Sequence, residues 1–497
     1  MRAAASGSLI PDVVALIFHN SPFIYGILNN NKRERLMNNL FSRRFFVGSL
    51  AAAGASHFLG CKGLGKYVAN SKVRLAVIGC GGQGAWDVDA FEKYPDLCEI
   101  VALVDTDIGA QHTLKTLRKY PNLPRFTDFR KMFDVMDDKI DAVLVAIPDH
   151  AHFCACIEAI RRGKAVYVEK PLAHSFHECE LLMKAEAEEG VVCQMGNQGH
   201  SGNSFYQYRD YVASGILKDV VKVVSHMNME RRWHKWGGKI NSFPKAEKMP
   251  ATLDWDTWIG PAPYNDFSKD LAYGEWRCWY DYGMGCMGDW GAHILDSVHR
   301  FTLKGALPEE VKISSLSGAN KFVFPIEDTV TMTFKGGVKV EWYEGVDNKP
   351  KLPKGFRYVD NKGLFPASTA NDGLIDPPLK PGKEIYLADG TVWQGLSHSA
   401  TLVRCGAQDE KVPEFEKSYE DHWKNFLRAV RGETEAKSPF RVAGTLSQVF
   451  CLAVVAQRLG RSFKFDPVAK RALSDKEVDF YLEGPPPRKG WESYYKV

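Results

Sequence analysis

The chain has no dense basic block, no regular cysteine spacing and no long apolar run near its start. Its formal net charge is +4 over 497 residues, and basic residues never occur more than two in a row. This pattern argues against nucleic acid as a partner. The 11 cysteines form no CxxC pair, so neither a disulfide scaffold nor a zinc site is predicted. The apolar patch Val13 to Phe18 is much shorter than the ~20 residues that span a bilayer.

The first 70 residues are predicted to be a leader outside the fold. Ser42-Arg43-Arg44-Phe45-Phe46 resembles a twin-arginine export signal and precedes the weakly apolar stretch Val47 to Gly60. Met37 lies where such a signal usually begins, so it is an alternative start to Met1. The residues before Cys61 loosely resemble a lipoprotein cleavage box, which leaves lipidation at Cys61 open. The alternative is that the arginine pair occurs by chance. If the pair is an export signal, the protein is expected to be periplasmic or exported, and lipidation at Cys61 would be its predicted attachment to a membrane.

A glycine-rich loop follows the apolar run Val73 to Ile78 and precedes a predicted helix. In such loops the first glycine turns tightly, the second admits a pyrophosphate and the third lets helix meet strand. Asp105 ends the next predicted strand, 21 residues after the last glycine, where a carboxylate accepts hydrogen bonds from a ribose 2′-hydroxyl. No Arg or Lys follows Asp105 within three residues, so NAD(H) is favoured over NADP(H). The loop reads Gly79-Cys80-Gly81-Gly82-Gln83-Gly84.

The remaining 427 residues are enough for two domains. Residues 71–193 alternate short apolar strands with helices, which predicts a doubly wound parallel sheet of the Rossmann type. The strands are expected at Val73–Ile78, Glu99–Val104, Ala142–Ala146, Ala165–Val168 and Val191–Gln194. The helices are expected at Ala85–Tyr94, Ile108–Lys119, Asp128–Met136, Ala151–Arg161 and Ser175–Glu188.

Residues 194–497 predict an α+β domain with a large, mostly antiparallel open sheet. An uncovered sheet face would need a partner, so a homo-oligomer is expected. Aromatic residues cluster between Arg232 and Tyr282, which suits either sugar stacking or core packing. The strands are expected at Val220–Asn228, Val311–Ser317, Thr329–Lys335 and Val338–Tyr343, and the helices at Tyr206–Ser214, Glu420–Arg431 and Arg441–Leu459, with a Pro/Gly/Lys-rich excursion over Asn348–Gly382.

Two segments at predicted strand ends carry polar residues. Pro148-Asp149-His150-Ala151-His152 suggests a metal cluster together with Cys154 and Cys156, but residues two apart on a helix cannot converge on one ion. No metal is predicted, and Pro148 and Asp149 are expected to shape the wall beside a nicotinamide. At the next strand end, Pro171 favours an extended Lys170, whose amine can orient or deprotonate an alcohol. The alternative is that Lys170 only pairs with Glu169 or another acid.

Asp289 and His293 are four residues apart in a predicted helix and share one of its faces. A histidine with a nearby carboxylate can transfer protons near neutral pH. Asp296, three residues beyond His293, is an alternative partner for its ring. A histidine satisfied within the core is the other alternative.

These motifs together resemble the Gfo/Idh/MocA family of oxidoreductases, named for glucose–fructose oxidoreductase and inositol dehydrogenase, over Val73 to Glu492. The resemblance implies that Lys170, Asp289 and His293 form the catalytic set. Segments 250–261 and 488–492 further resemble an exported bacterial subgroup, while the excursion departs from the short sugar dehydrogenases. The expected cofactor-binding residues are Gly79, Gly81, Gly82, Gln83, Gly84, Asp105, Pro148, Asp149, His152, Glu169 and Lys170.

Candidate substrate contacts lie in the second domain, beside Asp289 and His293. Gln198 and His200 lie at the start of that domain. The alternative is that this segment is only a glycine-lined hinge between the two domains. Arg277, Trp279 and Tyr282 precede the helix that carries Asp289, with core or interface packing as the alternative.

The predicted function is that of an exported NAD(H)-dependent oxidoreductase acting on CH–OH groups of a carbohydrate or polyol. Because an exported protein meets no maintained NAD pool, the cofactor is expected to be tightly bound and the overall reaction redox-neutral. One alternative is an NAD-dependent glycoside hydrolase or lyase working by transient oxidation and elimination, although the presence of Lys170 favours ordinary redox chemistry. A non-catalytic nucleotide-binding sensor is the other.

Overall fold

The computed structural model describes residues 71–232, 236, 239–356, 358–360, 363–365, 379–396, 401–406, 413–418 and 420–497. The predicted leader, with Met37, Arg43, Arg44 and Cys61, lies outside these residues. So does part of the predicted excursion between Asn348 and Gly382.

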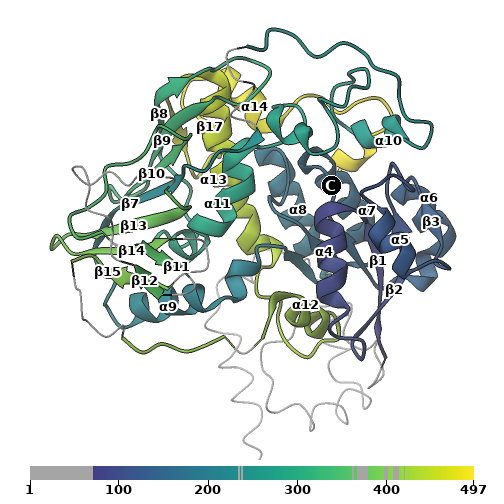
Figure 1. Ribbon diagram of the computed structural model, residues 1–497, viewed down its shortest axis with the longest axis horizontal. Helices are drawn as coiled ribbons and strands as arrows, with labels where there is room; N and C mark the ends of the chain where they lie inside the picture. The colour runs from purple at the N-terminus through teal and green to yellow at the C-terminus, as the bar shows by residue number, and fades with distance from the viewer. Residues whose placement is uncertain are drawn as a thin grey trace, which may run out of the picture. The chain divides into compact units, whose positions relative to one another are not determined.

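Residues 73–195 form a six-stranded sheet in which every neighbouring pair is parallel. Figure 1 labels its first three strands, at the right. The strand order is β3-β2-β1-β4-β5-β6, so the chain reverses its direction of travel across the sheet beside β1. Such a switch point is where ligands bind at the carboxyl ends of the strands. The predicted doubly wound sheet is confirmed, and β3 is an addition to it. The strands are β1 Val73–Ile78, β2 Cys98–Val104, β3 Arg125–Phe126, β4 Ala142–Val145, β5 Ala165–Val168 and β6 Cys193–Met195.

Helices cover both faces of this sheet because its strands are apolar on both sides. Val77 of β1 packs in one buried cluster and its neighbour Ile78 packs in the other. Ser175 caps α8 through its side chain, which accepts from the backbone N–H of Glu178, and Gly190 ends α8 in the left-handed conformation. The helices are α4 Gly82–Phe91, α5 Leu114–Lys119, α6 Phe129–Met136, α7 His152–Arg161 and α8 Phe176–Glu189.

One helix from the far end of the chain also covers the parallel sheet. Helix α12, His422–Val430, packs on the face that carries α4. The indole of Trp423 donates to the buried carboxylate of Asp87 at 3.1 Å, and the rings of Phe91 and Phe426 lie 6.1 Å apart. The second half of the chain therefore completes the core of the first.

The helix predicted over Ile108–Lys119 is too long, because α5 begins only at Leu114. The preceding residues form a loop held by side chains that bind its backbone. Asp105 accepts from the N–H of Asp107 at 3.1 Å, and Thr113 accepts from the N–H of Gly109 at 3.1 Å. Short polar side chains that satisfy the backbone in this way compete with helix formation.

The second half of the chain builds a nine-stranded sheet in the order β15-β14-β13-β7-β10-β9-β8-β16-β17, most of it teal and green at the left of Figure 1. Only β7 and β10 pair in parallel, which confirms the predicted mostly antiparallel sheet. The five strands from β13 onward were not predicted. The strands are β7 Val220–Met227, β8 Glu310–Ser317, β9 Glu327–Thr333, β10 Lys339–Glu344, β13 Gly382–Leu387, β14 Val392–Leu396, β15 Val403–Arg404, β16 Phe463–Asp466 and β17 Arg471–Ala472, with a separate pair, β11 Tyr358–Asp360 and β12 Gly363–Phe365.

Helices α11 and α13 contact this sheet. By length and composition alone, helix α13 could cross a membrane. However, 72% of its most apolar 18-residue stretch is buried inside the protein, where the helix packs against α8 and α11. The sequence alternation of β10 leaves Lys339 exposed while Val340 is buried, as in a strand with one covered face. The expected self-association stays a prediction. The helices are α9 Asn203–Ala213, α10 Trp255–Ile259, α11 Gly285–Ser297, α13 Phe440–Leu459 and α14 Lys476–Glu483.

Candidate active site

The glycine loop brings three backbones together at the end of β1. A Cβ at Gly79, where φ is +88°, would overlap the carbonyl of Ala146, and a Cβ at Gly84 would overlap the carbonyl of Gly79. These two glycines therefore let β1, β4 and α4 approach closely. Gly82 begins α4 with open space around it. Backbone N–H groups at the start of such a helix form a cradle for a diphosphate.

Asp105 lies at the end of β2, on the ribose side of this cradle. Its carboxylate accepts from the backbone N–H of Cys80 at 3.2 Å and contacts the ring of His112 at 3.3 Å. The hydrogen bond to Asp105 raises the pKa of His112. The carboxylate is thus fixed in the position from which it can accept from ribose hydroxyls.

A cavity of about 500 Å³ begins at this loop and continues toward the second domain. Most of the predicted cofactor residues line it, but Gly84 and Asp149 do not. The first domain contributes Gly79, Gly81, Gly82, Gln83, Asp105, Pro148, His152, Glu169 and Lys170. The second domain contributes residues that include Arg232, Trp258, Tyr273, Trp276, Arg277 and Asp289.

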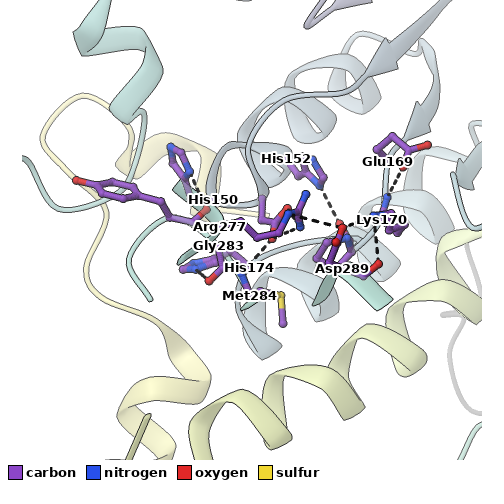
Figure 2. A network of polar contacts seen from close by, with 12 residues as sticks. His150, His152, Glu169, Lys170, His174, Arg277, Gly283, Met284 and Asp289 are labelled. Carbon is purple, nitrogen blue, oxygen red and sulfur yellow. Dashed lines mark hydrogen bonds and ion pairs between the residues drawn. The ribbon is translucent and has the colours of Figure 1, made fainter. Parts of the chain in front are cut away.

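Lys170 and Asp289 meet in the wall of this cavity (Figure 2). The Lys170 Nζ donates to Oδ1 of Asp289 at 2.8 Å and to its backbone oxygen at 3.2 Å. Burial alone would raise the pKa of Asp289, but the charges of Lys170 and Arg277 hold that pKa well below its usual range. Asp289 is consequently ionised, and it fixes the lysine amine where a substrate hydroxyl can reach it. The pairing of Lys170 with an acid, considered above as an alternative role, is therefore present, but the pair lies in the cavity wall.

Arg277 is the second cation beside Asp289. Its Nη1 contacts both carboxylate oxygens of Asp149 at 3.2 Å, and its Nε lies 3.7 Å from Asp289 Oδ1. Asp149 is 1% exposed and also accepts from the backbone N–H of Met284, the residue before α11. Asp149 does not form the cavity wall as predicted. It anchors Arg277 and the start of α11 from behind.

Glu169 lies next to Lys170 with its side chain almost wholly buried. Oε1 accepts from the amide of Gln198 at 2.7 Å, and Oε2 accepts from the backbone N–H of Lys170 at 3.3 Å. Burial raises the pKa of Glu169 to about 7. Gln198 is absent from the cavity lining and its amide binds Glu169, so its role as a substrate contact stays a prediction.

His200 is also buried rather than presented to the cavity. Its Nδ1 lies 2.9 Å from the carboxylate of Asp296, which also accepts from the amide of Asn197 at 2.9 Å. Asp296 therefore binds His200. The structure gives His200 this buried partner in place of the predicted position at the cavity, while Asp296 as an alternative partner of His293 stays a prediction.

Of the three residues expected before α11, only Arg277 lines the cavity. Tyr282 has no exposed surface, its hydroxyl accepts from the amide of Asn265 at 2.8 Å, and its ring packs against Trp258. Trp279 is likewise fully buried. The packing alternative thus holds for Trp279 and Tyr282, which corrects Tyr282 as a substrate contact.

His293 is one helical turn beyond Asp289 on α11, and it is only partly buried. Its ring lies 5.8 Å from that of Trp290, and its charge helps to lower the pKa of Asp289. It does not line the cavity, so its catalytic role stays a prediction.

His150 and His152 use their ring nitrogens on backbone carbonyls. His150 contacts the carbonyls of Trp258 and Tyr282 at 2.8 and 3.1 Å. His152 contacts those of Ile147 and Pro171, both at 2.8 Å. These two rings support the cavity wall structurally.

The sequence did not identify the wall formed by Arg232, Tyr273 and Trp276. Its only signal was the clustering of aromatic residues between Arg232 and Tyr282, which is equally typical of a core. The pairing of Arg277 with Asp149 carried no local signal, because these residues are 128 positions apart.

Two family models match the chain and together cover more than half of it. Residues 73–197 match the model described as "Oxidoreductase family, NAD-binding Rossmann fold", and residues 202–355 match "Oxidoreductase family, C-terminal alpha/beta domain". The chain belongs to the Gfo/Idh/MocA family. Its first domain is an NAD-binding Rossmann domain, as predicted.

Curated relatives of this family member match over parts of their length. Inositol 2-dehydrogenase/D-chiro-inositol 3-dehydrogenase of Halalkalibacterium halodurans is 30% identical over 160 residues, which is 32% of this chain and 45% of that enzyme. A glycosyl hydrolase family 109 protein of Shewanella putrefaciens is 26% identical over 166 residues, 32% of this chain and 36% of that protein. The chain thus spans less than half the length of each.

The fold also matches solved structures. The WlbA dehydrogenase from Bordetella pertussis, solved with NADH and UDP-GlcNAcA, aligns with a TM-score of 0.55 and 16% sequence identity. The alignment covers 80% of this chain and 99% of that one. At this identity the likeness establishes the two-domain fold.

Proposed function

We propose that this protein is an NAD(H)-dependent oxidoreductase acting on a CH–OH group of a carbohydrate or polyol. The observation that carries the proposal is the Lys170–Asp289 ion pair in the wall of a cavity that begins at the nucleotide loop. The related inositol dehydrogenase supports a polyol or sugar as the class of substrate.

The residues present fit NAD. A side chain at Gly79 or Gly84 would overlap backbone atoms, whereas glycine at these positions keeps the start of α4 open. The carboxylate of Asp105 is held where it can accept hydrogen bonds from a ribose. Gly82, Gln83 and Asp105 would hold the diphosphate and ribose, and Pro148, His152 and Glu169 would lie along the remainder. NAD supplies a hydride acceptor or donor when it is bound.

Lys170 is placed to handle the proton of the substrate hydroxyl. Asp289 orients the amine, and Arg277 keeps Asp289 ionised. In this arrangement a hydroxyl near Nζ can give up its proton on oxidation and regain one on reduction. His293, on the same helix as Asp289, is proposed as the second acid–base group.

Export through the twin-arginine pathway is part of the proposal and rests on Arg43 and Arg44. Such a protein would fold before export and carry its cofactor with it, which favours redox-neutral overall chemistry over net oxidation. We expect that changing both arginines to lysine leaves the folded protein in the cytoplasm, because the receptor reads guanidinium groups. Unimpaired export of this double variant, measured by fractionation, would refute the signal assignment.

Deuterium transfer tests the oxidoreductase activity. The native protein is incubated with sugars and polyols deuterated at each ring carbon, and the nicotinamide and products are analysed by mass spectrometry. Deuterium on the nicotinamide, followed by its appearance in product, is the expected result. Full turnover with no deuterium on the cofactor would falsify hydride chemistry, and binding of NAD without turnover of any sugar would favour the sensor alternative.

A second candidate function is glycoside cleavage by transient oxidation and elimination. The similarity to the glycosyl hydrolase family 109 protein favours it. Incubation with glycosides distinguishes the two, because cleavage releases the aglycone, whereas a dehydrogenase or epimerase leaves the glycosidic bond intact.

A further inference from the structure

His112, in the turn before α5, contacts the carboxylate that is expected to bind a ribose. Its Nε2 lies 3.3 Å from Oδ1 of Asp105, and 39% of its side chain is exposed. His112 also lines the cavity, although it was not among the predicted cofactor residues. An imidazole therefore lies at the point where the adenosine half of a dinucleotide would be recognised.

The carboxylate of Asp105 has little acceptor capacity left while His112 binds it. Oδ1 also accepts from the backbone N–H of Asp107 at 3.1 Å. Oδ2 accepts from the backbone N–H of Cys80 at 3.2 Å and contacts the thiol of the same residue at 3.9 Å. A carboxylate offers about four acceptor positions in all. A ribose hydroxyl that donates to Asp105 must therefore replace one of these four groups.

His112 is the group that can leave Asp105 without a change in the backbone. Two of the other groups are backbone N–H groups, and the thiol of Cys80 is fully buried. The backbone of His112 is held too, because the hydroxyl and the N–H of Thr113 bind the carbonyl of Ala110 at 2.8 and 2.9 Å. The partly exposed ring of His112 can nevertheless rotate about its side-chain bonds. A ribose is therefore expected to replace the imidazole and leave the other three contacts in place.

The same ring covers the second glycine of the nucleotide loop. A Cβ at Gly81 would overlap the imidazole of His112. In loops of this kind the second glycine is the place where a pyrophosphate comes close to the backbone. The imidazole thus lies beside two features that bind a dinucleotide, the acid for the ribose and the glycine for the diphosphate.

Two acids determine the charge of this ring. The hydrogen bond to Asp105, together with the charges of Asp105 and Asp107, raises the pKa of His112, although burial of the ring opposes them. Tyr273 of the second domain faces the imidazole with its ring centroid 6.3 Å away, and its hydroxyl binds Asp107. Lys115 of α5 is paired with an acid of α4. The protonated imidazole therefore binds Asp105 more strongly than the neutral one does.

We propose that His112 competes with the adenosine ribose of NAD for Asp105, so that binding of NAD displaces the imidazole and releases its proton to the solvent. Because protons favour the competitor, the affinity for NAD rises with pH until His112 is neutral in the free protein. The inference rests on the NAD-binding domain and is independent of the proposed hydride transfer.

Isothermal titration calorimetry of the nucleotide-free protein with NAD at pH 6, 7 and 8 tests this competition. Each titration is repeated in two buffers of different ionisation enthalpy, which gives the number of protons released. We expect the wild type to release up to about one proton and to bind NAD up to about tenfold more tightly per pH unit. His112→Gln and His112→Ala should release fewer protons, bind with little dependence on pH and exceed the wild-type affinity at pH 6.

Glu169 lines the same cavity, and burial raises its pKa to about 7, so it is a second source of protons. Proton release that the wild type and both His112 variants share is assigned to Glu169, and the difference between them to His112. ADP-ribose, which lacks the nicotinamide, is titrated in parallel. It should show the same difference, because it keeps the ribose that binds Asp105.

His177→Gln is the matched control. His177 lies on α8, 32% of its side chain is exposed, and its Nε2 lies 3.5 Å from the carboxylate of Glu483. This geometry resembles that of His112 with Asp105, but His177 does not line the cavity. Its variant should keep the wild-type proton release and pH dependence, and thermal unfolding should show that all variants fold.

Proton uptake on binding, or equal proton release in the wild type and both His112 variants, would overturn the proposal. Loss of NAD binding in both folded His112 variants would also overturn it, because removal of a competitor cannot weaken binding. The same would follow if His177→Gln lost the pH dependence. Because no substrate is present, a protein that releases the His112 proton but transfers no hydride would support the competition and refute the proposed function.

Discussion

The ammonium of Lys170 lies 2.8 Å from the carboxylate of Asp289, although the two residues are 119 positions apart. Lys170 follows a strand of the parallel sheet, and Asp289 belongs to the helix that packs against the antiparallel sheet. The pair therefore joins the two halves of the chain at the cavity. Arg277 is a second cation beside Asp289, so the aspartate keeps a cationic neighbour when the lysine is removed.

Lys170→Ala should reduce turnover by about 10²–10⁴-fold while NAD still binds, because Lys170 serves the hydroxyl proton and not the cofactor cradle. His293→Ala should have a similar effect. The double variant should lose less than the product of the two single losses, since both groups act in one transition state. Turnover and NAD titration of the four proteins check this.

Lys184→Ala is the control for charge removal, since Lys184 is 50% exposed on α8 and does not line the cavity. Its amine contacts Glu188 at 4.0 Å and the backbone oxygen of Val497 at 2.8 Å. Unchanged turnover in Lys170→Ala would show that the ion pair is structural.

Asp105→Ala should weaken NAD(H) binding by about ten- to a hundredfold and narrow the preference over NADP(H). The substitution removes an ionised acceptor of ribose hydrogen bonds, which contributes roughly 1.5–3 kcal/mol, and it also removes the repulsion of a 2′-phosphate. Titration of stripped protein with both nucleotides measures the ratio. Asp89→Ala removes a more exposed acid from α4, 33% exposed, and should leave the ratio unchanged. Equal affinities for both nucleotides in the wild type would contradict the assignment.

Glu169→Gln should gain stability relative to the wild type as the pH rises. Burial raises the pKa of Glu169 from 4.5 to about 7, so the folded protein keeps a proton that the unfolded chain has lost. The wild-type free energy of unfolding consequently falls across this pH window. The glutamine variant has no such proton. The difference between the two proteins in free energy of unfolding should therefore grow by at most about 1.4 kcal/mol per pH unit.

Urea unfolding of both proteins at pH 5, 6 and 7 measures this difference. Burial also raises the pKa of Glu186 to about 7, but that group is common to both proteins and cancels. A difference that does not change with pH would show that Glu169 is ionised throughout.

Gly84→Ala should lower the free energy of unfolding by about 1–3 kcal/mol, because the new methyl group would overlap the backbone oxygen of Gly79 and neither backbone can yield cheaply. NAD binding should weaken with it as α4 moves. Gly199→Ala is the matched control, since no atom lies within 4 Å of its added Cβ, and it should change stability by less than about 0.5 kcal/mol. Equal unfolding energies for the two variants would contradict close packing at the loop.

The parallel sheet was predictable because its strands are short apolar runs buried on both faces. Strand β5 begins and ends at the predicted residues, Ala165 and Val168. Strand β13 was not predictable, because it carries Lys383 and Glu384 in the interior. Lys383 donates to the carbonyl of Ile294, and Glu384 contacts His226 at 3.0 Å. Local sequence cannot show that a charge is buried when its partner comes from a distant segment.

The same limit applied to the site. The glycine loop, Asp105 and Lys170 were identifiable because each directly follows a recognisable strand. The partners of Gln198 and His200 were not predictable, because nothing near them in sequence indicates that Glu169 and Asp296 bind them. Polar residues beside a cleft serve either the ligand or each other, and only their three-dimensional partners decide which.

Because α12 covers one face of the parallel sheet, the core of the nucleotide-binding domain can be completed only after α12 has been synthesised. Trp423 reaches Asp87 across 336 positions, so one apolar face of the parallel sheet waits for nearly the whole chain to be made. Closing so long a loop is slow compared with forming the local strand–helix units, and the waiting sheet exposes apolar surface in the meantime. Helix α4, whose first turn forms the diphosphate cradle, is among the elements that α12 supports. We expect the full support of α4 to form only after residue 430 has been added, and the emerging chain to expose this apolar surface until then.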